Sequence, residues 1–175
     1  MAINDALASF VSSSLSLVAA SGVDVPSTNV LDLMGDGAGT TVLNIWGNST
    51  LPFSPDARGV GSPLPMIDIL IGTTPVDGTG TPTLTVQLQG AEDNGSGSPG
   101  SYATYIATAA LATASIPTGT RIRMPFAPPF PINDRPRFLR LNFEIPAGTA
   151  YSAGTILSAN VVFPRDDMYS LQQPR

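Results

Sequence analysis

Hydrophobic and polar residues alternate along several segments of this chain. In Thr83–Gly90, residues Leu84, Val86 and Leu88 fall on one side and polar residues on the other. The same period of two recurs in Arg121–Phe126, Arg137–Ile145 and Thr155–Phe163. A period of two places every second side chain on the same face of a strand. These four segments therefore predict half-buried strands of antiparallel sheets.

Each of the last three segments has an expected core face made of apolar residues. The inward residues are Ile122, Met124 and Phe126, then Leu139, Leu141, Phe143 and Ile145, and finally Leu157, Ala159, Val161 and Phe163. The outward residues are Arg121, Arg123, Phe138, Arg140, Asn142 and Glu144. We expect Arg140 and Glu144 to form an ion pair across or along the same sheet face.

Shorter patterns predict weaker strands and the turns between them. The weaker strands are Leu15–Ala20, Asn29–Leu33, Val42–Trp46, Met66–Ile71 and Tyr102–Thr108. Gly, Pro, Asn and Asp predict turns at Gly35–Gly39, Thr73–Pro82, Glu92–Gly100, Ala127–Pro136 and Pro146–Gly154. Ala107–Ala114 is compatible with one helical turn, and no segment has a sustained helical period.

These elements predict an all-β fold, an antiparallel β-sandwich of jelly-roll type with eight or nine strands. The 17 glycines and 17 prolines of the 175 residues suit many short strands joined by turns. We expect a single domain over residues 1–175, with an N-terminal arm (about 1–14) and a C-terminal tail (about 164–175). Asn48–Pro63 is expected to be a long surface loop that serves interaction.

The side-chain chemistry of the chain argues against catalysis. It contains no histidine, cysteine or lysine, and all eight of its positive charges are arginine. Histidine is the usual proton shuttle near neutral pH, cysteine and lysine are common nucleophiles, and zinc and copper sites normally use His and Cys. We therefore expect no enzyme activity, no catalytic residues, no cofactor and no metal.

Charge and hydropathy limit the partners. A net charge of −5 argues against nucleic acid, because phosphate binding needs a basic surface. Ala6–Val23 is an uncharged run, but it contains six serines and follows Asp5 without a positive segment, so neither a signal peptide nor a membrane span fits. We expect no membrane partner.

Two chemical alternatives stay open from the residues alone. Glu92 and Glu144 are the only glutamates, and a glycosidase would need two such carboxyls facing each other. Glu92–Gly95 offers oxygens to calcium but lacks the ligand spacing of an EF-hand, so turn residues explain it better.

The most distinctive run is Asn133–Asn142. It carries Arg135, Arg137 and Arg140, and arginine suits interfaces because its planar fork binds carboxylates and stacks on aromatic rings. A solvated strand face paired with Asp134 and Glu144 is the plainer interpretation. The interface candidates are Arg135, Arg137, Phe138, Arg140, Trp46 and Phe53.

The same residues carry a family resemblance. It rests on Ser27–Leu33 (Ser-Thr-Asn-Val-Leu-Asp-Leu), Pro63-Leu64, Thr81–Gly90, Asp93-Asn94-Gly95, Arg135–Asn142 and Ala153-Gly154-Thr155. In this order they resemble the capsid cement (decoration) proteins of tailed phages related to the Bordetella phage cement protein. The match spans roughly Ser12 to Val162. Asn44–Gly61 is longer than the family leads us to expect, and nothing after Phe163 is matched.

The resemblance implies a jelly-roll virion protein without enzyme activity. It implies a homo-oligomer, a dimer, that binds the major capsid protein on the outer surface of an icosahedral capsid, at joints between capsomers, and stabilises the DNA-filled shell. The alternative is a carbohydrate-binding β-sandwich of a phage receptor-binding or adhesin protein. Such a site needs exposed aromatic rings, for which the candidates are Trp46, Tyr102, Tyr105 and Tyr151.

Overall fold

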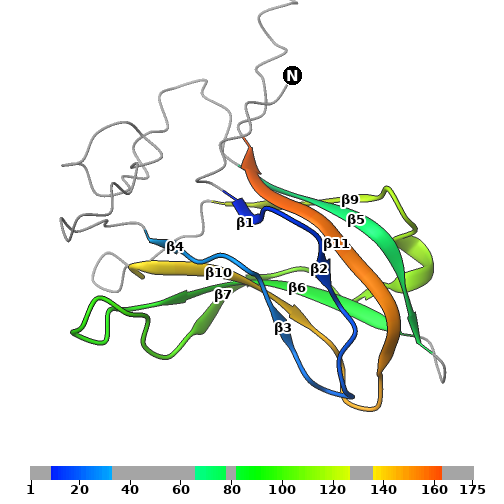
Figure 1. Cartoon of the computed structure of the whole chain (residues 1–175), viewed down its shortest axis with the longest axis horizontal. Coiled ribbons are helices and arrows are strands. Elements are labelled where there is room, and N and C mark those ends of the chain that lie inside the picture. The colour runs from blue at the N-terminus through cyan, green and yellow to red at the C-terminus, as the bar shows by residue number, and fades with distance from the viewer. Residues whose placement is uncertain (1–8, 33–65, 78–81, 127–135, 163–175) are drawn as a thin grey trace, which may run out of the picture.

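The protein is an all-β sandwich of two antiparallel sheets packed face to face (Figure 1). The computed structural model describes residues 9–32, 66–77, 82–126 and 136–162. The predicted all-β sandwich is thus confirmed, although the described residues alone form eleven strands rather than eight or nine. No helix in these ranges is long and apolar enough to cross a membrane.

The strands divide into two sheets, here called sheet I and sheet II. Sheet I has the order β1-β11-β5-β9, with β2 also paired to β11. Its strands are β1 (Ser9–Val11), β2 (Leu15–Ser16), β5 (Met66–Asp77), β9 (Arg121–Pro125) and β11 (Tyr151–Val162). Sheet II has the order β3-β10-β6-β7, with β4 also paired to β10 and β8 to β6. Its strands are β3 (Val25–Pro26), β4 (Leu31–Asp32), β6 (Thr83–Ala91), β7 (Ala103–Ala107), β8 (Leu111–Ala112) and β10 (Phe138–Glu144).

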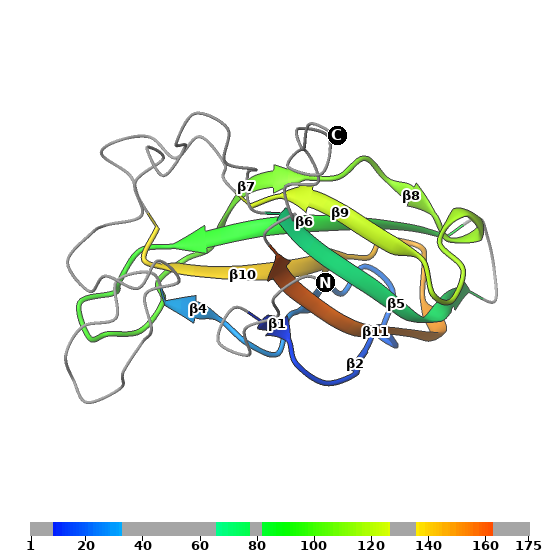
Figure 2. The same ribbon diagram turned by 90° about the horizontal axis from the view of Figure 1, so that it is seen from above.

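The first four strands bridge the two sheets along one side of the sandwich. β1 and β2 pair with β11 of sheet I, and the chain then crosses so that β3 and β4 pair with β10 of sheet II. The Asn29 amide N–H donates to the Phe10 carbonyl at 3.0 Å and ties the two arms together. Figure 2 shows β1, β2 and β4 on this side and β7, β8 and β9 on the opposite side. The expected N-terminal arm (about 1–14) therefore includes a strand whose three residues are all buried.

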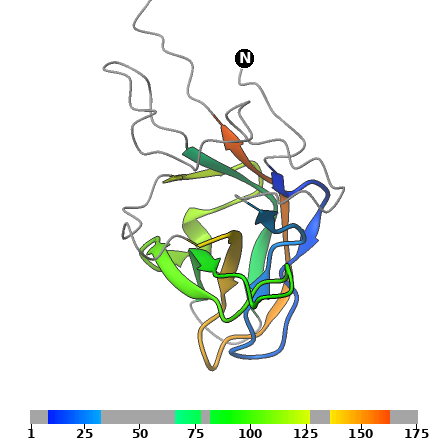
Figure 3. The same ribbon diagram turned by 90° about the vertical axis from the view of Figure 1, so that its left-hand side faces the viewer.

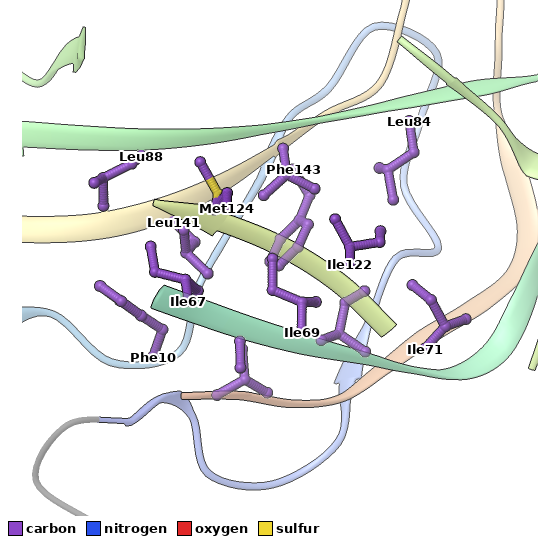
Figure 4. Close-up of a cluster of buried hydrophobic side chains, with 14 of the residues drawn as sticks. Phe10, Ile67, Ile69, Ile71, Leu84, Leu88, Ile122, Met124, Leu141 and Phe143 are labelled. Carbon is purple, nitrogen blue, oxygen red and sulfur yellow. The ribbon is translucent and has the colours of Figure 1, made fainter. Parts of the chain in front are cut away.

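Figure 3 shows the two sheets from another side, and the core fills the space between them (Figure 4). Leu84, Val86 and Leu88 are fully buried, as their alternation predicted. The inward residues expected from β9 and β10 are buried as well: Ile122, Met124, Phe126, Leu139, Leu141, Phe143 and Ile145. Phe10 and Phe126 meet edge to face with ring centroids 6.4 Å apart, which joins the N-terminal arm to the end of β9.

The core face of β11 differs from the prediction. Ala159 and Val161 are buried as expected, but Leu157 is 50% exposed and Ile156 is buried instead. The pairing of β11 with β5 shifts register between Ile156 and Ser158. A β-bulge adds one residue and so reverses which side chains face inward on one side of it. Phe163, the fourth expected inward residue, lies outside the described residues.

Strand β5 runs six residues past its expected end at Ile71, into the predicted turn Thr73–Pro82. Among the described strands, β11 alone pairs with β5 beyond Leu70, so Pro75 lies where a missing N–H is tolerated. Opposite it, a Cβ on Gly154 would come within 3.0 Å of the Pro75 Cα, and Gly154 has φ of 142°. The close approach of the two backbones explains why glycine stands there.

Other expected elements changed in extent. The strands predicted at Leu15–Ala20 and Asn29–Leu33 shrink to β2 and β4, while Tyr102–Thr108 is β7. The helical turn allowed at Ala107–Ala114 is replaced by β8 and a 3-10 turn, Thr113–Ser115. Predictions that lie outside the described residues are the strand Val42–Trp46, the turn Gly35–Gly39, the loop Asn48–Pro63 and the tail about 164–175.

Candidate functional site

Three of the six predicted interface residues lie in the described part of the chain. Arg137 comes immediately before β10, Phe138 begins that strand, and Arg140 lies two positions further on. Arg135, Trp46 and Phe53 lie outside the described residues. The structure separates the three described residues into two environments, one buried and one on the outer face of sheet II.

Arg137 is the centre of a buried ion cluster. Its Nη2 donates to Asp32 Oδ2 at 2.9 Å and its Nε donates to Asp32 Oδ1 at 3.1 Å, a two-pronged contact. Its Nη1 donates to Asp93 Oδ2. Asp32 ends β4 and Asp93 follows β6, so the guanidinium joins three segments that are far apart in the sequence. Paired geometry of this kind is the strong form of an arginine–carboxylate contact.

Asp93 also organises the loop between β6 and β7. Its Oδ1 accepts the Gly95 and Gly97 amide N–H groups at 2.8 and 2.9 Å. Burial acts to raise the pKa of the Asp93 carboxyl, but the Gly97 and Gly95 amides and the Arg137 charge outweigh it and hold that pKa below its usual 3.8. Both oxygens are therefore engaged by protein donors. The described residues hold no group of three or more acidic side chains able to bind a metal.

Phe138 belongs to the same buried cluster. It is 6% exposed, its ring lies 4.9 Å from the Arg137 guanidinium carbon, and its strand neighbours are Asp32 and Ala91. Arg137 itself is 8% exposed. Because both side chains are used inside the fold, they are positioned to support a surface rather than to form one.

Arg140 lies on the outer face of sheet II and is half-buried. Its guanidinium carbon stacks 3.7 Å from the Tyr102 ring centroid, and its Nε donates to Gln89 Oε1 at 2.9 Å. The expected ion pair with Glu144 is wrong: Glu144 Oε2 accepts from Gln87 Nε2 at 2.7 Å instead. Four strand positions separate Arg140 from Glu144, about 13 Å, which is too far for contact.

The amides around Arg140 form a ladder that crosses sheet II. Gln87 Oε1 accepts from Gln89 Nε2 at 2.8 Å and from Asn142 Nδ2 at 3.1 Å. Asn142 Nδ2 also donates to Asp24 Oδ2 at 2.8 Å. Gln89 and Asn142 are buried, at 9% and 2% exposed. These donors and acceptors satisfy one another, so few of them remain to bind a ligand.

Of the four aromatic residues expected to stack against a sugar, Tyr151 is buried, and Tyr102 and Tyr105 are partly covered. Tyr151 is 2% exposed and its hydroxyl donates to the Thr83 carbonyl at 2.8 Å, which links the two sheets. Tyr102 is covered on one face by Arg140, and the described residues offer its buried hydroxyl no hydrogen-bond partner. Tyr105 packs over Gly90. Trp46 lies outside the described residues.

The two glutamates do not form a glycosidase pair. The register of β6 with β10 sets Ala91 opposite Phe138 and Thr85 opposite Glu144. Glu92, which follows Ala91, is thus at the opposite end of the sheet from Glu144, at roughly 20 Å given the rise of a strand. Paired glycosidase carboxyls stand only about 5 to 10 Å apart.

Sequence reasoning singled out Arg137 but missed its partners and the Tyr102 stack. Asp32 and Asp93 are ordinary turn residues by type, and only their place in the quoted motifs Ser27–Leu33 and Asp93–Gly95 drew attention to them. Comparison of the chain with protein-family models and with curated proteins finds no match.

Proposed function

We propose that this chain is a structural virion protein, a cement protein of a tailed phage. It binds the major capsid protein on the outer surface of the capsid, at joints between capsomers, and stabilises the DNA-filled shell. In this proposal the sandwich is of the jelly-roll type and acts as a dimer. Its role is mechanical, so it needs no cofactor and no catalytic side chain.

The observation that carries the proposal is the ion cluster of Arg137. Its three members come from three separate segments of the family resemblance, Ser27–Leu33, Asp93–Gly95 and Arg135–Asn142. Residues quoted only for their order in the sequence thus meet in one buried contact. This supports the resemblance because short motifs that match by chance have no reason to converge in space.

A second network ties two of these segments, Ser27–Leu33 and Arg135–Asn142, to the N-terminal arm. Ser27 Oγ accepts from the Leu141 amide at 3.1 Å and donates to the Asn29 carbonyl at 2.9 Å. Asn29 Nδ2 donates to the Ser9 carbonyl at 3.0 Å. These bonds fix the N-terminal arm to both sheets. We expect a sandwich held in this way to lose little conformational entropy when it docks onto a shell.

The protein would stabilise the shell because its binding is linked to the assembled state of the capsid. Specific protein contacts bury ~1,600 Å² in total. A protein that binds the expanded shell better than its separated capsomers stabilises the shell by mass action. A dimer adds a second attachment, and the high effective concentration of that attachment strengthens binding without new contacts. Packaged DNA pushes outward, so joints between capsomers are the places where such reinforcement acts.

The experiment compares particles with and without the protein. Particles produced without it should release DNA at lower temperature, or on chelation, and purified protein added back should restore retention. Equal DNA retention in both preparations, with the protein present on one of them, would contradict the proposal. Only a few copies per particle, located on a tail fibre, would favour the carbohydrate-binding alternative.

A further inference from the structure

The outer face of sheet I carries a second charged group, which the sequence patterns identified only as outward-facing residues. Asp68 of β5 lies beside two arginines of the edge strand β9. Arg123 Nε donates to Asp68 Oδ1 at 3.1 Å, and Arg121 Nη1 donates to Asp68 Oδ2. One carboxylate therefore holds two guanidiniums side by side.

The exposure of these side chains is uneven. The Asp68 side chain is 11% exposed, whereas those of Arg121 and Arg123 are 52% and 62% exposed. Each guanidinium has five N–H donors, and in the described part of the chain each gives one nitrogen to Asp68. Because both arginine side chains are more than half exposed, donors remain available to a partner. Since Asp68 already restrains both long side chains, less rotamer entropy is lost when they bind a partner.

Apolar side chains adjoin the two arginines. Leu70 is half-buried and pairs with Arg121 on one side and with Ser158 on the other. Leu157 lies beside Ser158 and is 50% exposed because of the bulge in β11. β-Bulges are over-represented where a strand re-aims a side chain at a functional surface. Arginine is enriched at the cores of interfaces, and the two leucines supply apolar area beside it.

We propose that this face, made of Arg121, Arg123, Leu70 and Leu157, docks onto an acidic, partly apolar surface of the partner protein. The inference rests on the proposed function, in which that partner is the major capsid protein. Two positive charges share one negative charge here, although the chain as a whole carries −5. The local excess of positive charge selects carboxylates on the partner.

A nucleic acid is a poorer occupant for this face. Its phosphates repel the remaining acidic surface, and one pair of arginines neutralises few of them. Protection of an exposed strand edge is the plain structural role for charges on β9. Edge protection needs only exposed charges. It does not require that both arginines bind Asp68, nor that Leu157 is exposed beside them.

The test measures binding of purified protein to particles that lack it, by co-sedimentation at low salt. The double variant Arg121→Gln/Arg123→Gln should bind roughly tenfold more weakly or worse, because central arginines are common hot spots. Leu157→Ser should also weaken binding. Val30→Ser is the matched control, since Val30 is 43% exposed and lies between β3 and β4 of sheet II. Each variant is first shown to melt as the parent does.

The results of these binding measurements distinguish a failure of the proposed function from a failure of the proposed docking face. If the parent protein does not bind particles at all, the proposed function fails and the docking face fails with it. If the parent binds and the arginine pair variant binds equally well, the docking face is wrong. Loss of binding with Arg140→Gln but not with the pair would place the contact on sheet II instead. If the Arg121→Gln/Arg123→Gln variant still binds particles but no longer binds DNA, the two arginines form a site for nucleic-acid phosphates instead.

Discussion

Arg137 and Asp32 form a two-pronged buried contact across 105 positions of sequence, with Arg137 Nη2 2.9 Å from Asp32 Oδ2. Asp93 accepts from the same guanidinium, so one cation serves two carboxylates. Removing one member of a buried ionic group leaves the others uncompensated. The cluster should therefore be the most sensitive polar feature of the fold.

The substitution Arg137→Met keeps an unbranched, flexible side chain but removes the guanidinium and its charge. It should lower the free energy of unfolding by about 1–3 kcal/mol, because it leaves the Asp32 carboxylate, whose side chain is 21% exposed, without its cation. The control is Arg123→Met, whose side chain is 62% exposed and whose loss should cost about 0–1 kcal/mol. Urea unfolding of the two variants measures both. Equal losses would show that Arg137 is no more important than a surface ion pair.

The lowered pKa of Asp93 predicts an acid-sensitive contribution to stability. A carboxyl with a depressed pKa in the folded state stabilises the fold above its unfolded pKa, and this contribution is lost as pH falls through the folded pKa. Asp93→Asn should therefore be less stable than the parent at neutral pH. The gap should begin to close as pH falls below the ordinary value of 3.8. Unfolding curves at several pH values measure the gap, and a gap that stays constant into strong acid would contradict the assignment.

The raised pKa of Tyr151 predicts a contribution to stability that is lost in alkali rather than in acid. Burial, with a smaller contribution from Asp77, raises the pKa of its hydroxyl from 10.0 to about 12. The neutral hydroxyl is thus preferred in the fold, so its contribution is present below pH 10.0 and is lost as pH rises toward about 12. Tyr151→Phe should cost about 1 kcal/mol at neutral pH, from the lost bond to Thr83, and should become relatively less harmful in alkali. The difference in tyrosine absorbance between the parent and Tyr151→Phe during a pH titration shows whether this hydroxyl ionises late, because the other tyrosines, including Tyr102 with its raised pKa, cancel in the difference.

Gly90 is the glycine of sheet II with the least room. A Cβ there would lie 2.5 Å from Tyr105 Cε2 and 2.6 Å from Pro136 Cβ. Gly90→Ala should therefore destabilise the protein by about 1–3 kcal/mol, the usual cost of overpacking. Gly100→Ala is the control, because its Cβ would meet only the Glu92 carbonyl oxygen at 3.4 Å. Thermal melting of the two variants compares them, and an equal effect would mean that the Tyr105 ring moves aside without cost.

The core could be predicted where strands are regular. Leu84, Val86 and Leu88 on β6, and Ile122 and Met124 on β9, follow a strict alternation, and all are buried. Local periodicity alone fixes the face of such a strand. Leu157 was placed wrongly because a bulge depends on the pairing with β5, which the sequence of β11 does not record.

The candidate site was less predictable than the core. The arginine-rich run did stand out, but the partners of Arg137 depend on the register of β10 with both β4 and β6. Arg140 and Glu144 were expected to pair because they share a sheet face, and the distance along the strand prevents it. The sequence around Asp68 did not predict its contacts with Arg121 and Arg123, because these contacts depend on the pairing of β9 with β5.

Electron cryomicroscopy of particles that carry this chain, combined with its copy number per particle, tests whether it is a cement protein. A cement protein should be present in hundreds of copies on the outer surface of the shell, each bridging neighbouring capsid subunits at the joints between capsomers. A few copies confined to the tail, or none on the particle, would contradict the proposed function.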